Sequence, residues 1–236
     1  MLDINQLGFS FPGQAASPMN FHLSVSDGEV LSLIGPSGAG KSTLLNLVAG
    51  FLQAHAGQIN VDGEFIHTLA PAQRPVSMIF QQHNLFPHLD LFTNVGLGVD
   101  VSMRLNVAQR DAINEAFNRL GIEGLQKRKP GEVSGGQRQR AALARVLVRN
   151  RKVLLLDEAF AALGPAQRDE MIEMVADLVR EKEMNALLIS HQPQDAMLAS
   201  KRTAFLEAGR ISTIDSTDKL LRAPDQPEVR QYLGLK

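Results

Sequence analysis

The residues best suited to chemistry form a glycine-rich loop that ends in a lysine and two hydroxyl side chains. The loop reads Gly35, Pro36, Ser37, Gly38, Ala39, Gly40, Lys41, Ser42, Thr43. A glycine, four residues and then Gly-Lys-Ser is the spacing of a phosphate-binding loop, in which backbone N–H groups converge on an anion. The motif predicts that ATP binds here, with Lys41 at the β- and γ-phosphates and Ser42 as a ligand of Mg²⁺. The competing explanation is a glycine-rich turn that happens to precede a lysine. The apolar run before the loop and the helical segment after it argue against that explanation.

A second group of candidates follows a short apolar run. Residues 153–156 are all apolar, and Asp157 and Glu158 come directly after them. A carboxylate at the end of a buried strand suits the Mg²⁺ ion of a bound nucleotide, so we assign Asp157 this role. Glu158 is placed to polarise the water that attacks the γ-phosphate. Many buried strands end in acids, so both assignments depend on the phosphate-binding loop.

A third motif separates families of ATP-binding proteins. It consists of Ser134, Gly135, Gly136 and Gln137, and it opens a segment of helical character that extends to Arg149. Serine is a favoured N-cap, and glycine amides at a helix N-terminus form a second anion-binding site. With all three motifs in this order, the chain resembles the nucleotide-binding subunits of ABC transporters over nearly its whole length. The resemblance implies a homodimer in which this motif of one subunit closes over the γ-phosphate bound by the other.

The resemblance implies roles for three further residues. Gln81 matches the glutamine that senses Mg²⁺ and water and connects the core to a helical subdomain. His191 matches the switch histidine that contacts the γ-phosphate, and Phe11 lies where the family stacks an aromatic ring on adenine. A lone glutamine or histidine is more often structural, and Phe9 competes with Phe11 for the stacking role.

The chain also departs from the family pattern. Val133 replaces the usual leucine before the third motif, and Ala159 replaces the proline that usually follows the catalytic glutamate. Residues 161–164 read Ala-Ala-Leu-Gly where the family usually has Ser-Ala-Leu-Asp. The usual aspartate helps to join the two subunits, which Gly164 cannot do with a side chain. An ATP-binding module that dimerises but barely hydrolyses ATP therefore stays open as an alternative.

The surrounding elements must position these residues. Strands are expected at residues 9–11, 21–25, 30–34, 58–61, 76–80, 153–156 and 186–189, and helices at residues 42–49, 106–120, 134–149 and 171–179. This alternation predicts an α/β fold with a mainly parallel sheet. The family resemblance adds a P-loop NTPase core, an N-terminal antiparallel β part and a single ABC ATPase domain over residues 1–236. In that domain a helical subdomain is inserted at approximately residues 85–150.

Composition excludes several classes of function. The 236 residues are 44% hydrophobic and 21% charged, which is ordinary for a globular protein. A formal net charge of −1 gives no general basic field, so no nucleic-acid partner is expected. The chain has no cysteine, which excludes disulfides, thiolate metal sites and cysteine nucleophiles.

Neither a signal peptide nor an apolar stretch of the about 20 residues that span a bilayer is visible. The resemblance therefore implies a peripheral protein on the cytoplasmic face of the bacterial inner membrane. It also implies an integral membrane permease as partner and, indirectly, a periplasmic substrate-binding protein. ABC ATPases of DNA repair or of the ribosome usually carry coiled coils or two motor domains, and this sequence has neither feature.

Within the family, the chain is most similar to the ATPases of thiamine importers of Gram-negative bacteria. The similarity rests on residues 35–51, 74–98 and 131–149 and on the shortness of the chain. It implies uptake of thiamine and thiamine phosphates. Importers of iron, sulfate or molybdate stay open as alternatives.

Five apolar residues follow Gln81 closely: Leu85, Phe86, Leu89, Leu91 and Phe92. They form either a groove for a short helix of the permease or the core of the helical subdomain.

Overall fold

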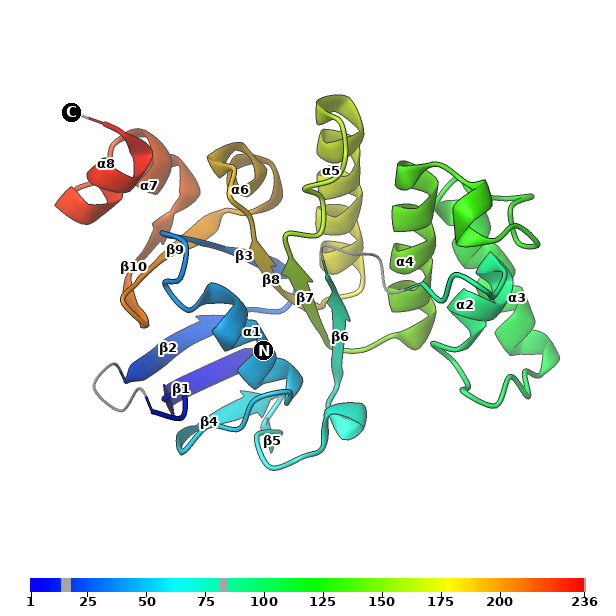
Figure 1. Ribbon diagram of the computed structural model, residues 1–236, viewed down its shortest axis with the longest axis horizontal. Coiled ribbons are helices and arrows are strands. Elements are labelled where there is room, and N and C mark those ends of the chain that lie inside the picture. Colours follow the sequence, from blue (N-terminus) through cyan, green and yellow to red (C-terminus); the bar gives the residue numbers. More distant parts are fainter. Residues whose placement is uncertain (14–17, 81–84, 236) are drawn as a thin grey trace.

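The protein is described by a computed structural model that places residues 1–13, 18–80 and 85–235 (Figure 1). The strands are β1 (Leu2–Phe9), β2 (Met19–Val25), β3 (Glu29–Ile34), β4 (Ala56–Val61), β5 (Glu64–Phe65), β6 (Val76–Ile79), β7 (Val153–Asp157), β8 (Asn185–Ile189), β9 (Arg202–Glu207) and β10 (Arg210–Ser216). They form one sheet in the order β5-β4-β1-β2-β10-β9-β3-β8-β7-β6.

The helices are α1 (Lys41–Ala49), α2 (Leu91–Gly96), α3 (Val107–Arg119), α4 (Gly135–Arg149), α5 (Pro165–Glu181), α6 (Pro193–Ala199), α7 (Thr217–Arg222) and α8 (Pro227–Leu233). Short 3-10 turns lie at Pro71–Gln73 and Pro130–Glu132. Within the three described ranges, no helix combines the length and the apolar character needed to cross a membrane.

The central strands are parallel and covered on both faces. Strands β9, β3, β8, β7 and β6 lie side by side in this order and pair in parallel with one another. In β7, Val153 and Leu155 belong to the apolar cluster that contains α1, whereas Leu154 and Leu156 belong to the cluster that contains α5. Because side chains alternate along a strand, a continuous apolar run of this kind requires a helix on each face.

The N-terminal part of the sheet is antiparallel. Strand β1 lies between β2 and β4 and pairs antiparallel with both, and β5 extends this part at the edge. The predicted fold class, an α/β core with a mainly parallel sheet and an N-terminal antiparallel part, is confirmed. One predicted strand was wrong in its bounds: β1 ends at Phe9, because Pro12 and Gly13 form a turn soon after it.

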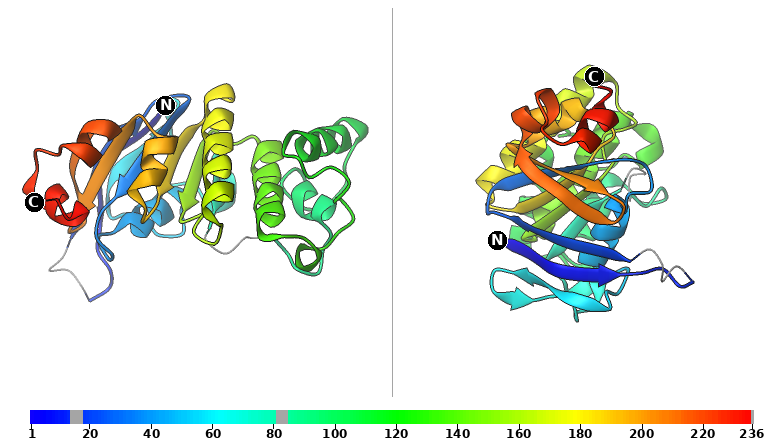
Figure 2. Two further views of the ribbon diagram at one scale, coloured as in Figure 1. Left: turned by 90° about the horizontal axis from the view of Figure 1, so that it is seen from above. Right: turned by 90° about the vertical axis from the view of Figure 1, so that its left-hand side faces the viewer.

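Helices α2, α3 and α4 gather at one end of the molecule, beside the sheet rather than on it (Figures 1 and 2). All three lie between residues 85 and 150. Ile113, Phe117 and Leu91 are fully buried among them, and their apolar cluster continues into α5. The helical group therefore shares its core with one face of the sheet.

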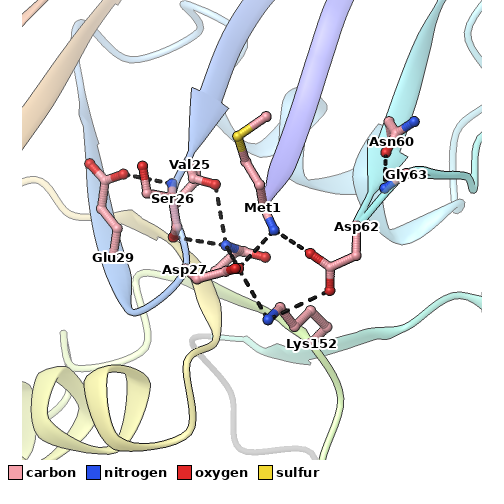
Figure 3. Close-up of polar contacts among 10 residues, drawn as sticks. Met1, Val25, Ser26, Asp27, Glu29, Asn60, Asp62, Gly63 and Lys152 are labelled. Atoms are coloured by element: carbon pink, nitrogen blue, oxygen red, sulfur yellow. Dashed lines mark hydrogen bonds and ion pairs between the residues drawn. The ribbon is translucent and has the colours of Figure 1, made fainter.

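A group of charges joins several strand ends at the opposite edge from the predicted site (Figure 3). Lys152 Nζ lies 3.1 Å from Asp27 Oδ1 and 3.5 Å from Asp62 Oδ2. The buried Asn185 amide donates to the Ser26 carbonyl at 2.8 Å and to Asp27 Oδ1 at 3.1 Å. The amino group of Met1 and then Lys152 lower the pKa of Asp27 to about 2. These contacts hold together the starts of β3, β7 and β8.

Candidate active site

The carboxyl ends of three adjacent parallel strands meet at one edge of the sheet. Gly35 follows β3 directly, Asp157 is the last residue of β7, and His191 lies two residues after β8. The register pairs Leu33 of β3 and Asp157 of β7 with the same residue of β8, Ile189. The topology therefore brings together residues more than 100 positions apart, at the edge where ligands bind in open α/β sheets.

The glycine-rich loop takes a backbone path that other residues fit poorly. Gly35 has a φ of +146°, and a Cβ at this position would lie 2.0 Å from the carbonyl oxygen of Leu206. Helix α1 begins at Lys41. Its N-cap is Gly40, so no side chain caps the helix, and its first turn contains no acidic residue. Because no side chain caps this helix, its first backbone N–H groups remain available to an anion.

Lys41 is positioned by the loop that precedes it. Its side chain is buried, and Nζ donates to the carbonyl oxygens of Gly35 at 2.7 Å and of Pro36 at 2.8 Å. Burial lowers the pKa of Lys41, while the carboxylates of Glu158 and Asp157 oppose this shift. The ammonium group thus lies in the loop close to two acids, where a phosphate group can replace its carbonyl partners.

Ser42 and Asp157 form a pair of oxygen ligands. Ser42 Oγ donates to Asp157 Oδ1 at 3.2 Å. Burial raises the pKa of Asp157, and the hydrogen bond from Ser42 opposes the shift. Mg²⁺ prefers hydroxyl, carboxylate and phosphate oxygens and usually takes only one or two carboxylates from the protein. Ser42 and Asp157 would therefore suit a magnesium ion, which would neutralise charge on a bound phosphate.

Glu158 and His191 are in direct contact. His191 Nε2 lies 2.6 Å from Glu158 Oε1, and both side chains are partly exposed at the edge of the sheet. Glu158 has a φ of +49°, which is uncommon outside glycine and found often at functional sites. Its backbone N–H donates to the carbonyl of Ile189 at 3.1 Å, which ties the end of β7 to β8.

The Ser-Gly-Gly-Gln motif lies elsewhere on the same chain. Ser134 caps α4: its Oγ accepts from the N–H of Gln137 at 3.2 Å, and the Gln137 side chain accepts from the N–H of Ser134 at 2.9 Å. Gly135 continues this first turn, and Gly136 faces Gln167 of α5. In the described part of the chain, the hydrogen bonds of this motif do not reach the phosphate-binding loop, and α4 lies with the helical group (Figure 1).

The remaining residues singled out in the sequence are Phe11, Gln81, Ala159 and Gly164. Phe11 is 37% exposed, and its ring packs edge-on against Phe9 at 4.8 Å between centroids. Phe9 is buried, so only Phe11 presents a ring face to a ligand. Gln81 lies outside the described residues. Ala159 is buried, and Gly164 is the N-cap of α5.

Sequence analysis missed several residues around the site. The buried side chain of Gln139 on α4 donates to the carbonyl of Ala159, next to Glu158. Arg168 of α5 and Asp195 of α6 form a buried ion pair beneath His191. These pairs are 20 and 27 positions apart and belong to no motif, so a single sequence carries no signal for them.

Known proteins resemble this chain over most of its length. The profile of the family described as ABC transporter matches residues 18–161. The thiamine import ATP-binding protein of Chelativorans sp. (strain BNC1) is 47% identical over 234 residues, covering 99% of this chain and 94% of the relative. That of Salmonella paratyphi A (strain ATCC 9150 / SARB42) is 49% identical over 220 residues, covering 93% of this chain and 92% of the relative.

Solved structures show the same fold. The dimeric post-hydrolysis state of the ATP-binding cassette MJ0796 bound to ADP and Pi superposes with a TM-score of 0.78 at 25% identity, covering 92% of this chain and 99% of that one. The ADP conformation of MJ1267, an ATP-binding cassette of an ABC transporter, gives a TM-score of 0.86 at 22% identity, covering 98% of each chain. The resemblance inferred from the three motifs is confirmed: this chain belongs to the ABC transporter family.

Proposed function

We propose that the chain is the ATP-hydrolysing subunit of an ABC importer that takes up thiamine and thiamine phosphates through a separate permease. One observation carries the enzymatic part: the sheet edge brings Lys41, Ser42, Asp157, Glu158 and His191 together beside an uncapped helix N-terminus. The cargo is inferred from relatives 45–49% identical over nearly the whole chain, all thiamine import ATP-binding proteins.

Each residue of the edge has one task in this proposal. Backbone N–H groups of residues 35–43 and Lys41 bind the phosphates of ATP. Ser42 and Asp157, with Gln81, hold Mg²⁺, which when bound neutralises charge on the phosphates. Glu158 orients the attacking water, and His191 stabilises the charge that develops on the γ-phosphate. Phe11 stacks on adenine, for which any aromatic ring face suffices.

The complete site requires two copies of the chain. The Ser134–Gln137 motif is another helix N-terminus, it begins with two glycines, and Gly136 faces Gln167 of α5. We therefore infer that Ser134, Gly135, Gly136 and Gln137 close over the γ-phosphate bound by a second copy. The dimeric state of MJ0796 supports this arrangement. Gly164 provides no carboxylate to join the subunits, so we expect looser coupling than a Ser-Ala-Leu-Asp loop gives.

A groove between the sheet and the helical group suits the permease. Its volume is about 280 Å³, and its lining includes Phe51, Met78, Leu85 and Val146. Phe51 is 56% exposed and stacks on Phe80, so the groove presents two aromatic rings to a partner. Leu85 lines the groove, whereas Leu91 is fully buried in the helical group, so both interpretations of this segment apply to different residues. Binding here would hold the chain at the cytoplasmic face of the bacterial inner membrane.

The enzymatic proposal is tested on the purified chain. We expect the native protein to hydrolyse MgATP and the Lys41→Ala variant to lose both binding and hydrolysis. The Glu158→Gln variant should bind ATP and accumulate as a dimer, which light scattering coupled to size-exclusion chromatography measures. Hydrolysis by the native chain no faster than by Lys41→Ala would leave an ATP-binding module, the alternative that Ala159 and Gly164 suggest.

A further inference from the structure

A buried ionic network lies directly beneath the histidine loop. Arg168 is 8%, Asp195 2% and Ser190 6% exposed. Arg168 Nη2 donates to Asp195 Oδ2 and, at 3.2 Å, to Ser190 Oγ. Ser190 Oγ in turn donates to Asp195 Oδ2 at 2.5 Å. The network joins α5, α6 and the end of β8 at one point.

The network holds the chain on both sides of His191. Ser190 precedes the histidine and belongs to the network, and Ser190 Oγ accepts from the backbone N–H of Gln192 at 3.0 Å. The His191 side chain itself is 49% exposed and contacts Glu158. The network thus fixes the backbone before and after His191, from which the half-exposed imidazole extends to Glu158. A small cavity of about 80 Å³ between Glu158, His191 and Arg168 shows that these groups face one another.

The same arginine is tied to the loop that replaces Ser-Ala-Leu-Asp. Arg168 lies in the first turn of α5, and its N–H donates to the carbonyl of Gly164 at 2.9 Å. Gly164 is the N-cap of this helix, and Pro165 fixes its first residue. A shift of residues 161–164 therefore moves the start of α5 and, with it, the guanidinium beneath His191.

Stability alone gives little reason for such a pair. Removing two charges from water costs about as much as their attraction returns, so apolar residues of similar volume often serve as well. Among the described residues, Arg168 Nε is also one of the few buried polar atoms with no hydrogen-bond partner. The pair thus stabilises the fold no better than apolar side chains would. Its hydrogen bonds, however, fix the position of Ser190, which precedes His191.

We infer that Arg168 and Asp195 are positioning residues that hold His191 in reach of Glu158 and link its position to residues 161–164. This inference rests on the proposed roles of Glu158 and His191 in ATP hydrolysis. The link to residue 164 runs through its backbone carbonyl, which glycine retains. A displacement of about 1 Å in a catalytic group lowers turnover by up to about a hundredfold.

The test uses the full chain and separates folding from positioning. Arg168→Met and Asp195→Leu each leave one buried charge unpaired, whereas the double variant Arg168→Met/Asp195→Leu removes both charges. We expect the double variant to melt near the native temperature and to bind MgATP with native Kd. Its kcat should be at least about tenfold lower than that of the native protein. Arg202→Met is the control, because Arg202 pairs with Glu29 at 3.0 Å at the far end of β3 and should not affect kcat.

A second readout reports on the histidine itself. In the protein labelled with ¹⁵N-histidine, the imidazole resonances of His191, assigned with His191→Ala, should shift in the double variant and not in Arg202→Met. The single variant Arg168→Lys keeps the positive charge beside Asp195. Its kcat should therefore lie between that of Arg168→Met and that of the native protein. Native kcat in the folded double variant, together with unchanged His191 resonances, would overturn the inference. If His191→Ala itself hydrolyses ATP at the native rate, then the proposed role of His191 fails instead.

Discussion

Replacing Gly35 by alanine tests how tightly the phosphate-binding loop is packed against the sheet. The loop leaves β3 at this residue with a φ of +146°, a conformation that is essentially confined to glycine. The added Cβ would lie 2.0 Å from the carbonyl oxygen of Leu206 and 3.0 Å from its carbonyl carbon. Leu206 belongs to β9, which pairs with β3, so the obstacle is backbone that cannot rotate away. Either the loop or the strand must move.

The expected cost has two parts. Backbone strain of this kind costs about 1–3 kcal/mol, and forcing extra volume into a packed interior costs about 1–3 kcal/mol. Gly35→Ala should therefore lower the free energy of unfolding by about 2–6 kcal/mol, a large part of the about 5–15 kcal/mol of a typical domain. At about 2–4 °C per kcal/mol for a chain of this length, the melting temperature should fall by roughly 4–24 °C.

Two other glycines provide matched controls. Gly38 lies in the same loop at φ +78°, but nothing lies within 4 Å of its Cβ position, so Gly38→Ala should cost only about 1–2 kcal/mol. Gly131 has neither a positive φ nor a neighbour within 4 Å, so Gly131→Ala should stay within about 0.5 kcal/mol of native. The assay is urea unfolding without nucleotide, with thermal melting in parallel. If Gly35→Ala is no less stable than Gly38→Ala, the close approach to Leu206 is not a constraint and the reasoning fails.

Three further perturbations have defined outcomes. Glu158→Gln should bind MgATP with native Kd and lose about 10²–10⁴ in kcat, since a carboxylate that orients or activates water contributes about that factor; unchanged kcat in a steady-state ATPase assay would remove Glu158 from its role. Arg74→Met should lower the free energy of urea unfolding by about 3 kcal/mol, because the buried guanidinium donates to the carbonyls of Leu47 and Val48 at the C-terminal end of α1; a loss below about 1 kcal/mol would contradict this. The lowered pKa of Asp27, about 2 against 3.8 for the free group, means that its stabilisation is complete above pH 3.8 and is lost as the pH falls through about 2. Asp27 is exposed, so Asp27→Asn should lower the free energy of unfolding by less than about 1 kcal/mol at pH 7. The difference in this free energy between variant and native protein should shrink as the pH falls towards 2; a difference that grows would contradict the assignment.

The sequence was sufficient wherever the chemistry depends on short spacings. The glycine-rich turn before α1, the acids after β7 and the capped start of α4 at Ser134 lie where the sequence predicts them, because each depends on residues within one turn or one strand end. The strands with continuous apolar runs were also predictable, since burial on both faces leaves a run such as residues 153–156 without polar alternation. The strand order that brings the ends of β3, β7 and β8 together was not predicted and comes from the structure.

Features that depend on tertiary contact could not be predicted. Nothing in the sequence distinguishes Arg168, which is buried against Asp195, from Arg180 on the same helix, which forms an exposed pair with Asp177. The positive φ of Glu158 likewise falls on a residue that is neither glycine nor asparagine, so the sequence gives no sign of it. The place of the C-terminal residues is also tertiary. Val229 of α8 is fully buried beside Phe205 of β9, and Tyr232 packs edge-on against the same ring at 5.5 Å.

The central claim joins ATP hydrolysis at this sheet edge to uptake of thiamine. The most direct test measures uptake of labelled thiamine by cells that lack the gene and carry either the native chain or Lys41→Ala, at matched protein levels. The account predicts that the native chain restores uptake, that Lys41→Ala does not, and that excess unlabelled thiamine phosphate competes with the label. Uptake that is the same with the native chain, with Lys41→Ala and with neither would contradict the thiamine assignment. It would leave an ATPase of the family whose cargo is another solute.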